Sequence, residues 1–358
     1  MPTLRKAAIW GPVLRSTGLG PYTVGDCVGE GCFCMVFEGH APPSADTVAL
    51  KVLEPVNAGL EDQFDFKNEG ILLRKLVKSR AVVDIFESRV DVVPLQTPQG
   101  ISVPVEVHAH VLEYADGALE ELLEDDVMRE EWDWSERLSH WRACVLGIHE
   151  MHLKRVVHRD LKSSNCLVFL GNADVPCKVS DLGRSRDLDK LAHVPAQDYL
   201  RGRGDLRFAP PELLWLTGEP ANAAAFKAAD VYALGSLLFE LGTGQGISAA
   251  ALPTPAEALR EALADRAAGV SRDLAALRPR YEIPLSHFRE ACPPAIRNEA
   301  TELIRLLCDP VPSERQPKIL GHRKSNGPGL TWLLRRADIL ERRLKHNARR
   351  SPHRPAGS

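Results

Sequence analysis

The sequence lacks a long hydrophobic run, a strong net charge and a regular cysteine pattern. No apolar stretch approaches the length of a membrane-spanning helix. The opening segment MPTLRKAAIWGP is interrupted by Arg, Lys, Gly and Pro before a signal-peptide core can form, so we expect a cytoplasmic location. A formal net charge of -3 provides no field that would indicate nucleic acid or a membrane as the main partner.

The eight cysteines are scattered, without the paired spacing of a zinc site or a disulfide framework. The one local cluster, Cys32-Phe33-Cys34, has no second pair of ligands nearby in the sequence, so structural zinc is not expected there. His149, His152 and His158 likewise lack a carboxylate or thiolate that would complete a metal site. We therefore expect reduced thiols and no histidine metal centre.

The chain is long enough to build two lobes around a substantial core. It has 358 residues, of which 44% are hydrophobic and 26% are charged, as in a globular protein. Residues 22–28 and 34–38 alternate in hydrophobicity around a glycine-containing tip and predict a hairpin. Residues 47–53 predict a third strand and residues 107–113 a further one, which ends at a polar, glycine-containing break.

One lysine interrupts the third predicted strand. Lys51 lies among apolar positions, and a buried ammonium is costly unless it is paired. Residues 63–77 predict a helix that places Glu69 18 positions later (69 − 51 = 18), on the same stripe as three leucines that would face a sheet. Asp65 is the less favoured partner. An outward-facing surface lysine is the alternative.

The segment 156–166, VVHRDLKSSNC, has the groups that phosphoryl transfer to a hydroxyl requires. Asp160 can orient an attacking hydroxyl and accept its proton, and Lys162 can neutralise charge on the migrating phosphoryl group. Asn165 offers a hard oxygen ligand to a magnesium ion. A helix predicted over residues 135–154 leads into this segment. A second predicted hairpin follows it and ends at Asp181.

The run His158-Arg159-Asp160-Leu161-Lys162 followed by Asn165 resembles the catalytic loop of eukaryotic-type Ser/Thr protein kinases. The resemblance covers about residues 20 to 320, with Cys34 in place of the third loop glycine and Leu182 in place of the usual phenylalanine. The other motifs that carry it, in family order, are Gly29-Glu30-Gly31 with Val36, Val48-Ala49-Leu50-Lys51, Glu69, Asp181-Leu182-Gly183, residues 208–212 ending in Glu212, Asp230 and Arg315. The resemblance implies a buried ion pair between Glu212 and Arg315.

This resemblance implies an α+β, bilobal protein kinase-like fold. A small β-rich N-lobe with one helix is expected over residues 20–114, and a larger, mainly helical C-lobe over residues 115–325. Residues 1–19 are then an N-terminal extension. Residues 326–358 are expected to form a C-terminal helix and a basic, disordered tail that begins near residue 347.

The resemblance also implies a site for ATP and magnesium. Asp160 is the expected catalytic base, with Lys162 and Lys51 as the other catalytic residues, and Asn165 and Asp181 are the expected magnesium ligands. Leu112 corresponds to the gatekeeper, and the backbone of Glu113 and Ala115 would contact adenine. The residues implied to contact the cofactor are Val28, Gly29, Glu30, Gly31, Val36, Ala49, Lys51, Glu69, Leu112, Glu113, Ala115, Asn165, Leu167 and Asp181.

Lys162, two residues after Asp160, resembles the Ser/Thr-specific class. The expected activity is therefore transfer of the γ-phosphoryl group of ATP to Ser/Thr hydroxyls of protein substrates, with a partner protein for regulation and no nucleic acid. A kinase-like nucleotide-binding scaffold with weak or no catalysis is the alternative. A kinase for small molecules is disfavoured, because such relatives lack the HRDLK and APE-like motifs together.

One departure concerns the catalytic loop directly. Gly204-Asp205 stands where Ser/Thr kinases generally have Gly-Thr. A carboxylate at this position would either raise the cost of ionising Asp160 or pair with Lys162. We expect it to restrain the substrate site.

Regulation by phosphorylation has few candidate positions. Between Asp181 and Glu212 only Ser185 and Tyr199 carry hydroxyls. The same segment is rich in arginine, which is compatible with an internal phosphate, an acidic substrate or a solvated basic loop.

Overall fold

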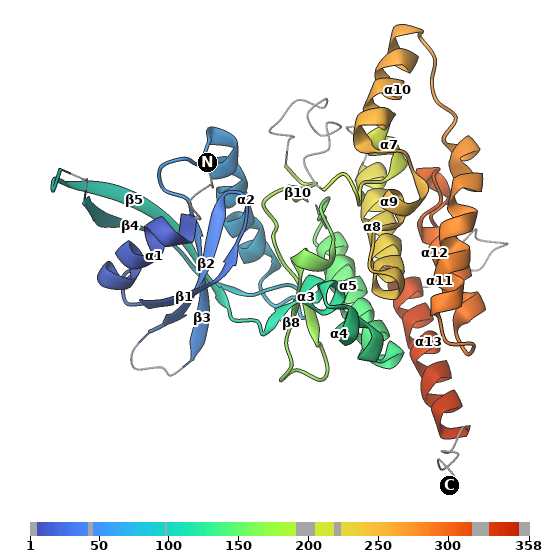
Figure 1. The fold of residues 1–358 in the computed structure, drawn as a ribbon, viewed down its shortest axis with the longest axis horizontal. Coiled ribbons are helices and arrows are strands. Elements are labelled where there is room, and N and C mark those ends of the chain that lie inside the picture. The colour runs from blue at the N-terminus through green and yellow to red at the C-terminus, as the bar shows by residue number, and fades with distance from the viewer. Residues whose placement is uncertain are drawn as a thin grey trace. The chain divides into compact units, whose positions relative to one another are not determined.

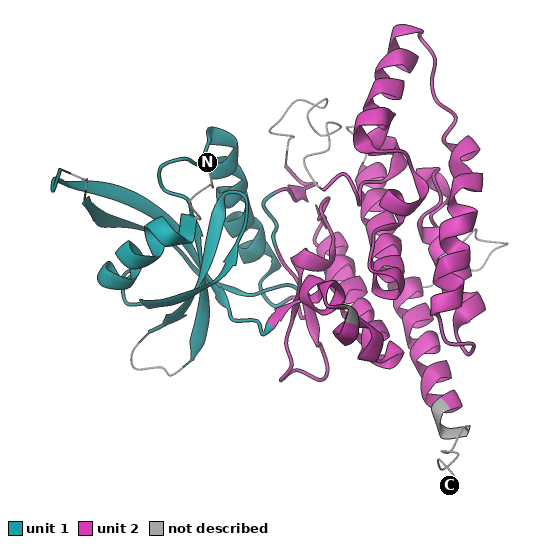
Figure 2. Ribbon diagram, viewed as in Figure 1, with its two compact units in different colours: residues 1–78, 82–116, 181–183 teal, residues 79–81, 117–180, 184–358 magenta. Residues whose placement is uncertain are grey.

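The computed structural model describes residues 6–41, 46–96, 99–190, 205–217, 223–316 and 329–350. The chain divides into two compact units (Figure 2). Unit 1 comprises the described residues of 1–78, 82–116 and 181–183, and unit 2 comprises those of 79–81, 117–180 and 184–358. The first holds a five-stranded antiparallel sheet and the second most of the helices, so the expected α+β, two-lobed class is confirmed (Figure 1).

Unit 1 is built around its sheet, whose strand order is β1-β2-β3-β5-β4 with every neighbouring pair antiparallel. Its elements are α1 (Lys6–Thr17), β1 (Thr23–Glu30), β2 (Cys34–His40), β3 (Thr47–Leu53), α2 (Leu60–Leu76), β4 (Ile85–Gln96) and β5 (Ser102–Glu113). The bounds of β3 agree with the prediction. Strand β1 ends at Glu30, two residues after the predicted end of the first strand at residue 28, because Glu30 still pairs with Met35 of β2.

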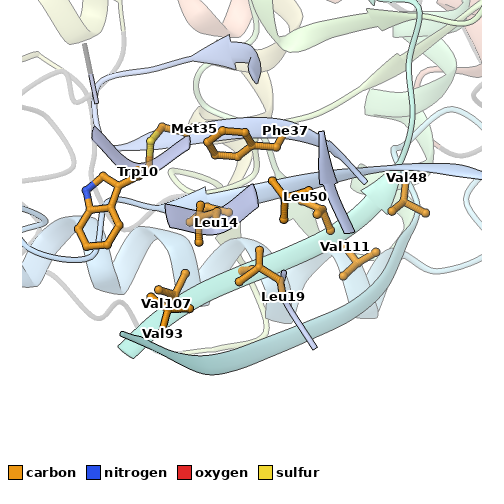
Figure 3. Close-up of a cluster of buried hydrophobic side chains, with 13 residues drawn as sticks. Trp10, Leu14, Leu19, Met35, Phe37, Val48, Leu50, Val93, Val107 and Val111 are labelled. Atoms are coloured by element: carbon orange, nitrogen blue, oxygen red, sulfur yellow. The ribbon is translucent and has the colours of Figure 1, made fainter. Parts of the chain in front are cut away.

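Helix α1 contributes to the hydrophobic core of unit 1. Trp10 and Leu14 are buried with Met35, Phe37 and Leu50 of the sheet (Figure 3). Burying a side chain of this size stabilises a fold by roughly 1.5–3 kcal/mol. The segment that the sequence suggests as an extension is therefore an integral part of this unit.

Unit 2 is mainly helical and carries two small sheets, one of β6, β8 and β9 and one of β7 and β10. Its helices are α3 (Leu119–Glu124), α4 (Asp126–Glu131), α5 (Trp134–Leu153), α7 (Pro211–Leu214), α8 (Ala223–Thr243), α9 (Ile247–Ala251), α10 (Pro255–Ala267), α11 (Glu282–Ala291), α12 (Arg297–Leu307) and α13 (Thr331–Arg350). The strands are β6 (Gly117–Ala118), β7 (Val156–Val157), β8 (Cys166–Val168), β9 (Cys177–Val179) and β10 (Arg186–Asp187), and short 3-10 helices are η1 (Ser163–Asn165), η2 (Leu274–Tyr281) and η3 (Pro312–Glu314).

Helix α8 is apolar around most of its circumference and is buried along most of its length, as expected for a central helix. Trp141 of α5 donates a hydrogen bond from its indole N–H to the Leu234 carbonyl of α8, 2.8 Å away. The two helices therefore form the frame on which the loops of unit 2 are held.

The terminal helix α13 packs against α5, where Arg142 forms an ion pair with Asp338. It continues to Arg350, through residues 347–350, which were expected to be disordered. Residues 351–358 lie outside the described part. Within that part, no helix is both long and apolar enough to span a membrane.

Candidate active site

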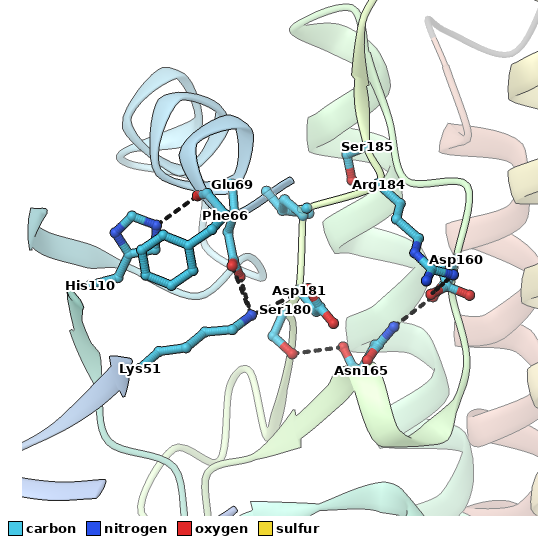
Figure 4. A network of polar contacts seen from close by, with 12 residues as sticks. Lys51, Phe66, Glu69, His110, Asp160, Asn165, Ser180, Asp181, Arg184 and Ser185 are labelled. Atoms are coloured by element: carbon cyan, nitrogen blue, oxygen red, sulfur yellow. Dashed lines mark hydrogen bonds and ion pairs between the residues drawn. The ribbon is translucent and has the colours of Figure 1, made fainter. Parts of the chain in front are cut away.

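In unit 1, Lys51 is held between two carboxylates (Figure 4). Its Nζ atom lies 2.8 and 2.7 Å from the two carboxylate oxygens of Glu69 and 3.3 Å from Oδ1 of Asp181. Burial alone would lower the pKa of Lys51, but the two carboxylates outweigh it and raise the pKa above its ordinary value. The ammonium is therefore charged at any physiological pH, and the predicted pairing with Glu69 is present.

A histidine that sequence reasoning did not single out supports this pair from the sheet. His110 of β5 lies directly opposite Lys51 of β3. Its ring stacks on Phe66 of α2 at 3.9 Å, and its Nε2–H donates to the Phe66 carbonyl over 2.8 Å. Burial lowers the pKa of His110 to about 4, so the ring is neutral at pH 7. The signal in the sequence was the second of two histidines in this strand, His110, between the apolar residues Ala109 and Val111.

The backbone at Asp181 is held in an unusual conformation. Its φ of 57° lies in the left-handed region, which costs a non-glycine residue roughly 1–2 kcal/mol. Asn68 of α2 donates from Nδ2 to the carbonyl of Gly183 over 2.9 Å. Leu182, which stands in place of the usual phenylalanine, is fully buried. The helix that carries Glu69 thus also fixes the segment that carries Asp181.

The glycine-containing tip between β1 and β2 is tied to α1. The Gly31 N–H donates to the Cys34 carbonyl over 2.9 Å. Lys6 of α1 donates from Nζ to the carbonyls of Gly31, at 2.6 Å, and of Cys32. Its backbone N–H donates to the Glu30 carboxylate over 3.0 Å. Sequence reasoning missed Lys6 because its segment was taken as an extension.

The side chain that replaces the third glycine is neutral. Burial raises the pKa of the Cys34 thiol to about 12. Across the hairpin Gly29 pairs with Val36, which is half-buried, while the Val28 side chain is exposed. These residues flank the glycine-containing tip, where the family resemblance implies nucleotide contacts.

The residues expected around adenine lie on two adjacent strands. Ala49 of β3 and Leu112 of β5 are directly opposite each other and are both buried. The Glu113 N–H already donates to the Asp84 carbonyl over 3.1 Å, and the Glu113 carboxylate accepts from the Asp84 N–H over 2.8 Å. The Glu113 N–H is therefore already used by a contact within unit 1. Ala115 follows this strand and is half-buried.

In unit 2, Asp160 lies in a polar setting that holds its carboxylate. Oδ1 accepts a hydrogen bond from the Asp205 N–H over 3.2 Å, and Oδ2 is 3.9 Å from the guanidinium of Arg184. Burial raises the pKa of Asp160, although Lys162 and Arg184 oppose the effect. A small cavity of about 40 Å³ lies beside these groups, lined by Asp160, Arg184 and Asp205 among others.

Asn165 closes residues 156–166 on themselves; we call them the catalytic segment after the family motif that they resemble. Its Nδ2 donates to the Asp160 carbonyl over 2.7 Å, so the end of the amide that remains for a ligand is Oδ1. Its carbonyl accepts from the Ser180 N–H over 2.9 Å. Lys162 precedes this turn and is half-buried, and Leu167 follows it in β8.

One of the two expected arrangements was an ion pair between Asp205 and Lys162. The described residues do not form it. Its carboxylate is bound by Arg207, with Nε–Oδ1 at 3.0 Å and the terminal nitrogen at 2.6 Å from Oδ2. Burial would raise the pKa of Asp205, but the hydrogen bonds from Arg207 outweigh it and lower the pKa. The extra negative charge is therefore neutralised locally. The group of Asp205 that contacts the Asp160 carboxylate is its backbone N–H.

Asp230 of α8 anchors the backbone of the catalytic segment. Its carboxylate accepts hydrogen bonds from the N–H groups of His158, at 2.9 Å, and Arg159, at 2.8 Å, and from Nε2 of His152 at 2.8 Å. Burial would raise the pKa of Asp230, yet these bonds hold it below its ordinary value. The bonds also stabilise Arg159, whose φ is 71°.

Of the two candidate phosphorylation positions, Ser185 is the one that lies among the described residues. Ser185 is buried, and its hydroxyl donates to the His158 carbonyl over 3.1 Å, so its modification would require local opening. Tyr199 lies outside the described residues. Arg159 donates to the Arg184 carbonyl over 2.9 Å and lies over the ring of Phe226 at 5.6 Å.

A buried ion pair joins segments that are far apart in the sequence. Arg315 binds both carboxylate oxygens of Glu212, at 2.7 and 2.6 Å. Its remaining N–H groups donate to the carbonyls of Asp309, Ala228 and Pro310. All five donors of the guanidinium are thus used. The predicted pairing of these two residues is present.

Sequence reasoning also missed a buried carboxyl group beneath the catalytic segment. Glu240 of α8 accepts a hydrogen bond from the Ser163 hydroxyl over 2.6 Å, and its other oxygen has no partner. Burial raises the pKa of Glu240 to about 7. The signal was a second acidic residue, after Asp230, in a mostly apolar helix.

We expect Glu240 to make the folded protein less stable as the pH rises. The group binds its proton more tightly in the folded chain, so its contribution is full below about pH 4.5 and is lost by about pH 7. The loss is at most about 3 kcal/mol. Glu240→Gln should remove this pH dependence, as measured by urea unfolding between pH 5 and 8, while Ser163→Ala should leave it. Parallel wild-type and Glu240→Gln profiles would contradict the assignment.

Comparison with known proteins agrees with this geometry. The protein kinase domain family matches residues 22–319. A serine/threonine-protein kinase named TIO from Arabidopsis thaliana is 28% identical over 64% of this chain and 15% of its own length. CBL-interacting protein kinase 9 from Oryza sativa subsp. japonica is 29% identical over 65% of this chain and 46% of its own length.

A third relative, the putative cysteine-rich receptor-like protein kinase 16 of Arabidopsis thaliana, is 30% identical over 61% of this chain and 29% of its own length. The chain thus spans less than half the length of each of these relatives. The family match covers most of the chain and includes Lys51, Asp160, Asn165 and Asp181. The chain belongs to the protein kinase family.

Proposed function

We propose that the chain is an ATP-dependent protein kinase that transfers the γ-phosphoryl group to Ser/Thr hydroxyls of protein substrates. The observation that carries this proposal is Lys51 fixed between Glu69 and Asp181, at 2.7 and 3.3 Å. A buried lysine costs free energy unless its charge is used. Here it is oriented and permanently cationic, as a group that binds phosphate oxygens needs to be.

The residues present fit a magnesium ion. The Asp181 carboxylate remains about half exposed, and the Asn165 amide nitrogen is engaged with Asp160, which leaves Oδ1 as its ligand atom. Both are hard oxygen donors of the kind that Mg²⁺ prefers. When bound, the ion would neutralise charge on the phosphate oxygens.

Asp160 is the proposed base. The acceptor hydroxyl would hydrogen-bond to its carboxylate, attack the γ-phosphorus and pass its proton to Asp160 as the bond to the bridging oxygen of ADP breaks. Lys162 would stabilise the charge of the transferred group. Its position two residues after Asp160 is the feature that favours Ser/Thr over Tyr as acceptor.

The residues proposed to contact the nucleotide are Val28, Gly29, Glu30, Gly31, Val36, Ala49, Lys51, Glu69, Leu112, Glu113, Ala115, Asn165, Leu167 and Asp181. Because Arg207 neutralises Asp205, the extra carboxylate near Asp160 gives no reason to expect a loss of catalysis.

The proposal is tested by incubation with magnesium and ATP labelled on its γ-phosphate, with generic protein substrates. We expect phosphoserine and phosphothreonine from the wild type and no signal from Lys51→Ala. Lys67→Ala, an exposed lysine on the same helix as Glu69, is the matched control and should keep full activity. If the wild type gave no signal but Mg-ATP still raised its melting temperature, the scaffold alternative would replace the kinase proposal.

A further inference from the structure

Three cysteines far apart in the sequence meet in the interior of unit 2. They are Cys144 of α5, Cys166 at the start of β8 and Cys177 at the start of β9, and all three are fully buried. Their sulfur atoms lie within 4.8 Å of one another. The Sγ atoms of Cys144 and Cys177 lie 3.5 Å apart.

The backbone explains why the three side chains converge. In the antiparallel pair of β8 and β9, Val168 is opposite Cys177 and Cys166 is two residues before Val168. Since side chains alternate along a strand, Cys166 and Cys177 lie on the same face. Helix α5, which packs against β9, brings Cys144 onto that face. We call Cys144, Cys166 and Cys177 the thiol cluster.

The spacing within the thiol cluster is close to that of a metal-bound set. A metal–sulfur bond of about 2.3 Å places three sulfurs in one plane about 4 Å apart. The observed separations need only small side-chain adjustments to reach this arrangement. Cysteines that serve only as small apolar core residues have no need to direct three thiols toward one point.

We propose that the thiol cluster binds one soft d10 metal ion, with Cu(I) as the ion that best fits its three ligands. Structural zinc sites almost always use four protein ligands, and among the described residues the group contains three. A water molecule is a poor fourth ligand at this fully buried position. Thiolates select soft ions, and Cu(I) is stable with three sulfur ligands.

Two imidazoles lie near the thiol cluster. His140 and His158 are both close enough to Cys144 to interact with it electrostatically. Metal binding would release thiol protons and involves no oxidation or reduction.

The site is connected to the proposed catalytic groups through the backbone. Cys166 directly follows Asn165, and Cys177 lies on the strand that leads to Ser180, whose N–H donates to the Asn165 carbonyl. A bound ion would cross-link α5, β8 and β9. We therefore expect metal binding to raise the melting temperature of the full chain.

The test uses the full chain, reduced and kept free of oxygen, and titrated with Cu(I) against a chromogenic Cu(I) chelator. Loading is done both on the folded protein and during refolding, because the site is buried. We expect one equivalent per chain, sulfur-only coordination with about three ligands by X-ray absorption, and a higher melting temperature. A parallel titration with Zn(II) should show weaker binding.

Variants then locate the site. Cys144→Ser and Cys177→Ser should each weaken Cu(I) binding at least tenfold, whereas Cys32→Ser, which removes an exposed thiol in unit 1, should leave it unchanged. Circular dichroism checks that each variant folds, and the wild-type ligand number decides the matter if one does not. Binding lost only in Cys32→Ser, fewer than two sulfur ligands in the wild type, or preference for Zn(II) over Cu(I) would overturn the proposal.

Discussion

Replacing Asp160 by asparagine is expected to lower the phosphoryl-transfer rate by about 10²–10⁴-fold, the usual contribution of a positioned general base. The change keeps the size of the side chain, and its carbonyl oxygen can still accept the hydrogen bond from the Asp205 N–H. What it removes is the basic oxygen that would take the proton of the acceptor hydroxyl. The fold and the affinity for nucleotide should therefore change little.

The measurement is kcat and KM for ATP and a peptide substrate, together with nucleotide affinity by calorimetry. Asp189→Asn is a suitable control, because Asp189 is an exposed aspartate of unit 2 that pairs with Arg155. It should keep the wild-type rate. A rate for Asp160→Asn within tenfold of the wild type would mean that another group accepts the proton.

Replacing Arg315 by alanine is expected to destabilise the protein by about 3–5 kcal/mol, because it leaves the Glu212 carboxylate buried without its partner. Three backbone carbonyls lose a donor at the same time. A typical domain is stable by only about 5–15 kcal/mol, so much of the chain could unfold. Arg315→Lys should also be destabilising, since an ammonium has three donors and no planar fork.

Urea unfolding followed by circular dichroism measures this effect. The matched control is Arg305→Ala on α12, where the arginine pairs with Glu282 and Glu302 at the surface. Such exposed pairs contribute roughly 0–1 kcal/mol. Equal losses for Arg305→Ala and Arg315→Ala would show that burial gives the Glu212 pair no special importance.

Much of the fold could be predicted because its signals are local. A run of β-favouring residues interrupted by one lysine located β3 to the residue, and the stripe of leucines on α2 indicated that Glu69 would face the sheet that carries Lys51. The Glu212–Arg315 pair was predicted from motif order, although its two residues are far apart. These features depend on periodicity or on resemblance, and both can be read from a linear sequence.

Other contacts could not be predicted, because they depend on which segments meet in space. Arg207 is only two residues from Asp205, but the spacing does not show that it, and not Lys162, would bind this carboxylate. Nothing local indicates that His110 would stack on Phe66 or that Lys6 would bind the glycine-containing tip. In each case the side chain could contact one of several partners of similar chemistry. The packing of the folded chain determines which partner it contacts.

The sequence by itself determined the family, the order of the elements and the chemical groups available for phosphoryl transfer, because those are set by residue type and spacing. Only the tertiary structure decided how these groups are paired. In the structure Arg207 binds the Asp205 carboxylate, and the buried Glu240 beneath the catalytic segment has a raised pKa. Three cysteines that are distant in the sequence lie together. Desolvation and partner choice depend on three-dimensional neighbours, which the linear sequence does not specify.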